Sequence, residues 1–176
     1  MRFSSGGDSL FCKLTTSKNF KFQINRLEEF QILLQALVAV ALGGILGFER
    51  ETAGKFAGFR TYMFVCLAAT LFVRLGLTLI GDAAAQFPAG TLRADPTRTI
   101  EALAVGISFI GAGAIFRDRT GTGMHGLTTA AGLLAAATIG VAIAINRYIF
   151  ACSITLIGLV ILRTFAYLER RLKLNG

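Results

Sequence analysis

Five long apolar stretches, separated by short polar segments, constrain this chain more than any other feature. A helix needs about 20 residues to cross about 30 Å of hydrocarbon. Because lipid cannot hydrogen-bond a peptide backbone, spans are helices or closed barrels, and continuous apolar runs favour helices. The pattern predicts an all-α, polytopic membrane helix bundle of about five transmembrane helices, at roughly Gln31–Phe48, Tyr62–Ile80, Glu101–Phe116, Leu127–Ile145 and Tyr148–Phe165.

The composition supports a membrane protein and excludes other classes. Apolar residues make up 54% of the chain, charged residues 16%, and the mean hydropathy is +0.64. A soluble domain is about 25% charged, so this balance argues against a soluble enzyme and against a disordered chain. The net charge of +8 is scattered between the apolar stretches. We therefore expect the bilayer, and not nucleic acid, as the chain's partner.

Two local features predict how the helices are joined and broken. The third stretch is short and contains Gly106, Gly111 and Gly113, which leaves two interpretations: a short helix packed tightly on its neighbours, or a kinked or broken span. Only Asn146 and Arg147 separate the fourth and fifth stretches. This spacing predicts a sharp helical hairpin.

The sequence predicts three segments. Residues 1–30 form a basic N-terminal extension, either partly disordered or a mis-assigned start. Residues 31–168 form the transmembrane domain, and residues 169–176 form a short cytoplasmic tail, with no soluble C-terminal domain. Lys and Arg outside the extension favour a cytoplasmic C-terminus, whereas the extension brings the two sides close to balance.

Small residues recur at every fourth position in three stretches, as in Ala104-x₃-Ser108-x₃-Ala112. In lipid, such stripes let helix backbones approach closely. We expect them to pack the bundle; pore lining and homo-oligomer formation stay open as alternatives. The predicted packing glycines are Gly43, Gly47, Gly106, Gly111, Gly113, Gly132 and Gly140.

Charged residues at the ends of the stretches are the main polar candidates. Glu49-Arg50-Glu51 follows the first stretch, where the helix dipole favours Arg50 and disfavours the acids. The acids are expected either to pair with Arg60 or with the basic cluster around Asp118, or to lie in a solvated loop. Arg74, inside the second stretch, is either functional or reaches the interface with its long side chain.

Asp95-Pro96 has the pattern of a helix start, with Asp as N-cap and Pro at the first helical position. Residues 121–126 match G-x-G-x-x-G, but they follow an apolar span and not a strand, so we interpret them as a flexible loop. His125 is the only histidine, and the acids form no dense cage. We therefore predict no catalytic set, no metal site and no cofactor.

Four ordered motifs resemble the MgtC/SapB family of bacterial inner-membrane proteins. They are residues 42–51 with 57–61 (LGGILGFERE, AGFRT), residues 95–98 (DPTR), residues 106–113 (GISFIGAG) and residues 126–131 (GLTTAA). The resemblance covers roughly residues 31–150. Tyr62 and Asn146 depart from it, because the family usually has His and Gly there.

The resemblance implies a multi-pass inner (plasma) membrane protein of a family associated with low-magnesium adaptation and virulence. It implies a non-enzymatic modulator of membrane machinery or ion homeostasis, in contact with another membrane protein complex. The alternative is a small transporter or channel for magnesium or another cation. The polar residues expected to carry function are Glu49, Arg50, Arg60, Thr61, Asp95, Arg98, Asp118, Thr128 and Thr129.

Overall fold

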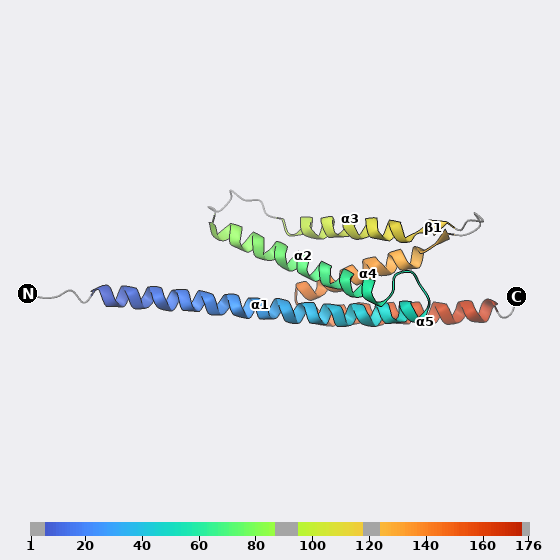
Figure 1. Cartoon of the computed structure of the whole chain (residues 1–176), viewed down its shortest axis with the longest axis horizontal. Coiled ribbons are helices and arrows are strands. Elements are labelled where there is room, and N and C mark those ends of the chain that lie inside the picture. The colour runs from blue at the N-terminus through green and yellow to red at the C-terminus, as the bar shows by residue number, and fades with distance from the viewer. Residues whose placement is uncertain (1–5, 87–94, 118–123, 174–176) are drawn as a thin grey trace, which may run out of the picture. The chain divides into compact units, whose positions relative to one another are not determined.

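The computed structural model describes residues 6–86, 95–117 and 124–173. Within them the chain forms helices α1 (Gly6–Thr52), α2 (Phe59–Gln86), α3 (Thr97–Ala114), α4 (Leu127–Ala144) and α5 (Tyr148–Lys173) (Figure 1). Residue contacts divide the chain into two units, Met1–Leu34 and Gln35–Gly176. The first unit contains the N-terminal part of α1. All contacts described below lie within the second unit.

The helix lengths agree with an all-α membrane bundle. Three of the described helices contain segments long and apolar enough to cross a membrane, Arg26–Thr52, Phe59–Asp82 and Leu127–Ala144. A shorter apolar segment, Tyr148–Thr164, lies in α5. The third stretch is one continuous helix of 18 residues, so the broken-span interpretation is wrong. This helix begins at Thr97, earlier than the apolar run suggests, because Asp95 and Pro96 start it.

Helix α4 is the centre of the bundle, since it packs against α2, α3 and α5. Half of its residues are buried, including Leu133, Ala136 and Ile139. Its small residues allow α2 to come close: a Cβ added at Gly140 would lie 2.7 Å from Ala69 Cβ and against the Cys66 carbonyl. The small residues of α4 therefore let its backbone lie closer to α2 than larger side chains would allow.

Helix α1 approaches α2 in the same way. A Cβ at Gly43 would lie 2.7 Å from the Tyr62 carbonyl oxygen, and one at Gly47 would lie 2.8 Å from Phe59 Cα. Real Cβ atoms do not come this close, so these positions require glycine. At the α1–α2 and α2–α4 interfaces the helix backbones are thus in direct contact, with no space for a side chain between them.

The glycines of α3 do not all serve such contacts. A Cβ at Gly111 would lie 3.3 Å from Ala130 Cβ on α4, whereas a Cβ at Gly106 or Gly113 meets nothing within 4 Å. The stripe of Ala104, Ser108 and Ala112 is also exposed. The expected packing role is therefore wrong at Gly106 and Gly113 within this chain, because α3 contacts the core through the buried Ile107 and Gly111 and the partly buried Leu103.

The turn between α4 and α5 is as short as predicted. Asn146 has φ of 60°, and its N–H donates to the Ile143 carbonyl at 3.0 Å. The Arg147 N–H donates to the Ala142 carbonyl at 2.8 Å. This pair of bonds is the Schellman motif, with Asn146 at the left-handed position that glycine usually occupies.

A short ribbon that the sequence did not predict connects α3 to α4. Strands β1 (Phe116–Arg117) and β2 (Met124–His125) pair antiparallel, with Phe116 opposite His125. The Phe116 ring packs edge-on against Phe56, with ring centroids 4.7 Å apart. The ribbon thereby contacts the loop between α1 and α2.

Candidate functional site

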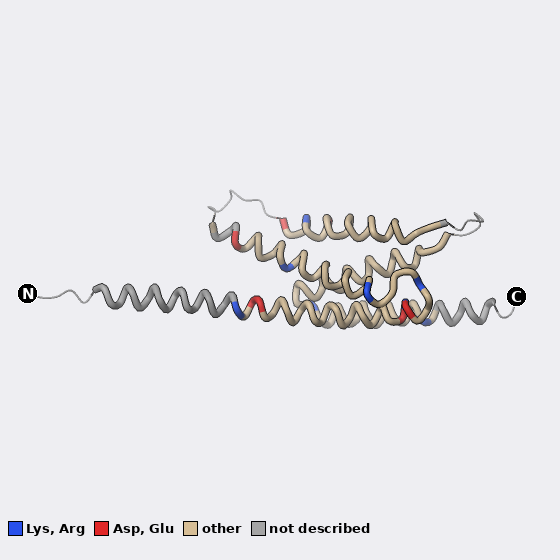
Figure 2. Tube along the Cα trace, in the orientation of Figure 1, with Lys and Arg blue, Asp and Glu red and all other residues tan. Residues whose placement is uncertain are grey.

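In the unit Gln35–Gly176, most charged residues lie near the ends of the helices, and Arg74 within α2 and Arg163 within α5 are exceptions (Figure 2). The end of α1, the start of α2 and the start of α4 meet at one end of the bundle, as the Gly47–Phe59 and Gly132–Tyr62 contacts require. Three predicted candidates, Glu49, Arg50 and Thr129, come together there. We call these residues with Tyr62 the Glu49 cluster.

The two charges of this cluster are buried. Glu49 is 8% exposed and Arg50 is 3% exposed, in the last turn of α1. Arg50 Nη2 donates to Thr129 Oγ1 across 3.5 Å, a long bond between α1 and α4. Neither Glu49 Oε2 nor Arg50 Nε has a hydrogen-bond partner in the described structure. Burying such groups costs free energy unless a partner compensates, so their retention suggests a role beyond packing.

Tyr62 completes the cluster from the first turn of α2. Its side chain is fully buried and lies close to both charges. Its hydroxyl lies near the Arg50 guanidinium but makes no hydrogen bond of good geometry in the described structure. A Cβ at Gly132 would overlap this hydroxyl, so the glycine provides the space for it. The site therefore depends on α1, α2 and α4 together.

Glu51 has a local structural role. Its Oε2 accepts a hydrogen bond from the Phe59 N–H at 2.8 Å and so caps the start of α2. Gly58 makes room for this bond, because a Cβ there would lie 2.7 Å from Glu51 Oε2. The expected pairing with Arg60 is wrong: Glu51 binds a backbone N–H, and Arg60 is exposed.

The remaining candidates at this end are placed differently. Thr128 is exposed, Thr61 is partly buried, and Asp118 lies outside the described residues. The prediction that the acids at the end of α1 pair with the basic cluster around Asp118 therefore stays a prediction. Thr128 lines a cavity of about 180 Å³ whose other walls include Tyr62, Gly132 and Gly158.

Asp95 and Arg98 lie at the other end of α2. A Cβ at Gly76 would lie 2.9 Å from Thr99 Oγ1, which places the start of α3 about 25 Å along α2 from Phe59. Asp95 Oδ1 accepts hydrogen bonds from the Thr97 N–H at 2.9 Å and the Thr97 hydroxyl at 2.7 Å. The Thr97 hydroxyl bond is the main cause of an Asp95 pKa below its usual value. Asp95 thus caps the first turn through Thr97, although the helix itself begins at Thr97 and Pro96 directly precedes it with helical φ and ψ.

Sequence reasoning missed a second buried polar contact. Gln35 is 1% exposed, and its Nε2 donates to the Ile143 carbonyl at 3.1 Å and to Asn146 Oδ1 at 2.8 Å. Thr70, also missed, has its hydroxyl within hydrogen-bond distance of two carbonyls, that of Cys66 at 2.9 Å and that of Gly140 at 3.0 Å. A polar side chain inside an apolar run is itself a signal of internal hydrogen bonding, and both residues have that pattern.

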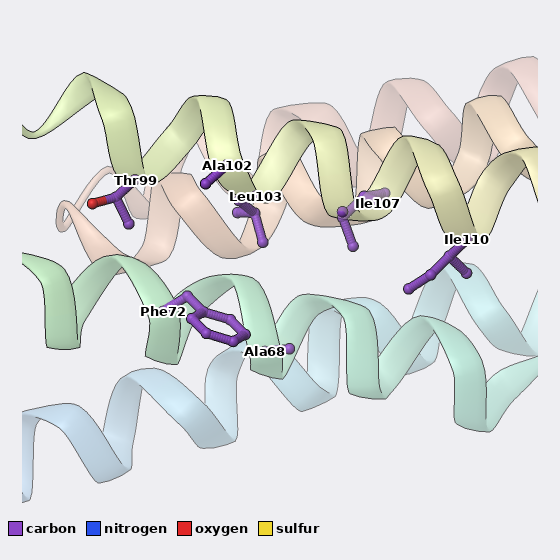
Figure 3. Close-up of a pocket in the computed structure, with 8 residues that line it drawn as sticks. Ala68, Phe72, Thr99, Ala102, Leu103, Ile107 and Ile110 are labelled. Carbon is purple, nitrogen blue, oxygen red and sulfur yellow. The ribbon is translucent and has the colours of Figure 1, made fainter.

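A groove with a volume of about 320 Å³ lies between α2 and α3. Leu103, Ile107 and Ile110 point from α3 toward α2, where the Phe72 ring lies (Figure 3). The lining is apolar apart from Thr99. None of the predicted polar residues lines this groove.

The described residues contain no group of three His, Cys, Asp or Glu side chains able to hold a metal. The Glu49 cluster offers one carboxylate beside one guanidinium, so its net charge is close to zero. The Glu49 cluster joins α1, α2 and α4 and contains buried polar atoms without hydrogen-bond partners in the described structure.

The family match and the related proteins point to the same family. The model of the MgtC family matches residues 36–171. Protein SrpB of Synechococcus elongatus is 32% identical over 70% of this chain and 65% of its own length. Protein MgtC of Salmonella typhimurium is 33% identical over 75% of this chain and 51% of its own length. Protein MgtC of Brucella abortus is 38% identical over 58% of this chain and 38% of its own length.

The chain therefore spans between about a third and two thirds of the length of these relatives. No solved structure matches it. The family match covers most of the chain, including every residue of the Glu49 cluster. Together with the apolar helices, these matches establish that the chain is a multi-pass membrane protein belonging to the MgtC family.

Proposed function

We propose that this chain is a non-enzymatic protein of the bacterial inner (plasma) membrane that modulates other membrane machinery during adaptation to low magnesium. Its C-terminus lies in the cytoplasm. The link to low magnesium rests on the family resemblance. The cytoplasmic C-terminus rests on the basic residues around the α1–α2 junction: Arg50 in the last turn of α1, Lys55 in the loop and Arg60 in the first turn of α2.

The observation that carries the proposal is the unpartnered outer face of α3. Only Ile107 and Gly111 of this helix are buried, while Val105 is 71% and Phe109 is 83% exposed. The neighbouring stripe of Ala104, Ser108 and Ala112 is exposed as well. In lipid, a small-residue stripe beside large apolar side chains suits close packing of another helix. The partner is a helix of another membrane protein complex or of a second copy.

Site-specific photo-cross-linking tests this proposal. A photoreactive phenylalanine analogue at Phe109 is expected to capture a membrane protein in cells grown at low magnesium. The matched control is the same analogue at Phe64, an exposed phenylalanine of α2 (69%). Capture that is equal at both positions, or absent at Phe109, would contradict a partner on α3.

The second candidate function is ion transport. The buried, unpartnered Glu49 Oε2 and Arg50 Nε favour it, because charges inside a membrane bundle often mark a pathway. The closed α1–α2–α4 contacts and the apolar α2–α3 groove favour the modulator instead.

Magnesium flux into proteoliposomes separates the two functions. We expect no flux above that of empty liposomes from protein whose helix content is intact by circular dichroism. Flux that either Glu49→Gln or Asp95→Asn abolishes would make the chain a carrier and overturn the modulator proposal.

A further inference from the structure

The groove between α2 and α3 has the dimensions of one lipid chain. Its apolar walls are Ala68 and Phe72 on α2 and Leu103, Gly106, Ile107 and Ile110 on α3 (Figure 3). From Thr99 to Ile110 the groove follows α3 for about 16 Å. One leaflet of a bilayer contributes about 15 Å of hydrocarbon. The groove therefore matches the depth of a single leaflet.

Gly106 keeps the groove open. A Cβ at this position meets no atom within 4 Å, so the missing side chain serves no helix contact. Glycine in a helix interior is destabilising relative to alanine. Free space beside Gly106 is what an occupant lying in the groove requires.

The end of the groove near the start of α3 carries charges of both signs. Thr99 lines the groove, and the exposed Arg98 precedes it by one residue. Asp95 lies three residues before Arg98 and is fully exposed, held by its two hydrogen bonds to Thr97. A headgroup at this end thus meets one guanidinium and one carboxylate.

We propose that this groove binds a phospholipid with a zwitterionic ethanolamine headgroup, with one acyl chain lying between α2 and α3. Arg98 binds the headgroup phosphate, and Asp95 accepts a hydrogen bond from the headgroup ammonium. A phosphatidylglycerol headgroup offers no cation to Asp95, and a choline headgroup has no N–H to donate. The inference rests on other residues than the partner proposed for α3, because Phe109 does not line the groove.

Native mass spectrometry of the full chain in detergent tests the proposal. The protein is titrated separately with dioleoyl phosphatidylethanolamine, phosphatidylcholine and phosphatidylglycerol. We expect phosphatidylethanolamine to be retained about tenfold more tightly than the other two, since one charge-assisted hydrogen bond distinguishes them. Asp95→Asn and Arg98→Gln are each expected to remove this preference.

Gly106→Leu fills the groove and is expected to abolish lipid retention. The matched control is Gly113→Leu, because Gly113 is equally open and lies on α3 but does not line the groove. Both changes replace glycine by a better helix former, so both proteins should fold. Equal retention of the three lipids, a preference for phosphatidylglycerol, or unchanged retention by Gly106→Leu would overturn the proposal.

Discussion

Gln35 and Asn146, separated by 111 positions in the chain, are joined by a hydrogen bond of 2.8 Å from Gln35 Nε2 to Asn146 Oδ1. The bond connects α1 to the turn that reverses the chain between α4 and α5. Asn146 thus serves twice, because its backbone occupies the left-handed position of the turn while its side chain anchors α1. Asparagine therefore suits this left-handed position, which glycine often occupies at the end of a helix, and adds a side-chain hydrogen bond that glycine lacks.

Substitution of Asn146 separates these two roles. Asn146→Gly keeps the left-handed backbone and loses the bond to Gln35, for a cost of about 1 kcal/mol. Asn146→Ala loses the bond and also strains the turn, for a further cost of about 1 kcal/mol. We expect the melting temperature in detergent to fall in the order wild type, Asn146→Gly, Asn146→Ala. If alanine is tolerated better than glycine, the turn does not limit stability.

Gly132→Ala is expected to destabilise the bundle by about 1–3 kcal/mol, because its Cβ would overlap the Tyr62 hydroxyl. Tyr62→Phe removes an unpartnered buried hydroxyl and should be neutral or stabilising alone. Combined with Gly132→Ala, it should restore most of the lost stability. Thermal unfolding of the two single variants and the double variant measures this coupling, with Gly113→Ala as control. Additive losses would contradict the contact.

Glu51→Ala is expected to destabilise the start of α2 by about 1 kcal/mol, because the Phe59 N–H loses its acceptor. Glu51→Gln keeps an oxygen at the same position and should retain most of the stability. Amide hydrogen exchange at Phe59 reports the bond directly, with faster exchange expected in the alanine variant only. Equally fast exchange in both variants would show that the bond requires the carboxylate charge.

The Asp95 cap predicts a pH dependence. The pKa of Asp95 is lowered from 3.8, chiefly by the hydrogen bond from the Thr97 hydroxyl. A lowered folded-state pKa means that the carboxylate stabilises the fold fully above about 3.8 and loses this effect as the pH falls through the lowered pKa. The difference in melting temperature between wild type and Asp95→Ala should therefore be larger at about pH 6 than at about pH 3. A difference that grows on acidification would contradict the cap.

The sequence by itself indicated the number of helices and two of their ends, whereas α1 extends over Gly6–Thr52, beyond the predicted Gln31–Phe48. Apolar runs set the spans, Asp95-Pro96 set the start of α3, and the Asn146-Arg147 joint set the hairpin. These features are local, because hydrophobic length, capping and turn chemistry act over a few neighbouring residues. Helix α3 shows the limit, since its hydropathy alone placed the start at Glu101 and left open a break that does not exist.

Only the tertiary structure decided which polar and small residues meet. Glycines that look alike in sequence differ in role: Gly132 faces Tyr62, whereas Gly106 faces a groove. Glu49 and Arg50 look like loop charges but are buried beside Thr129, and Gln35 reaches the far turn. These outcomes depend on how each helix is rotated about its axis and which neighbour it faces. The rotation and the neighbours of each helix are set by packing between segments distant in sequence. The length and composition of the apolar runs do not predict them.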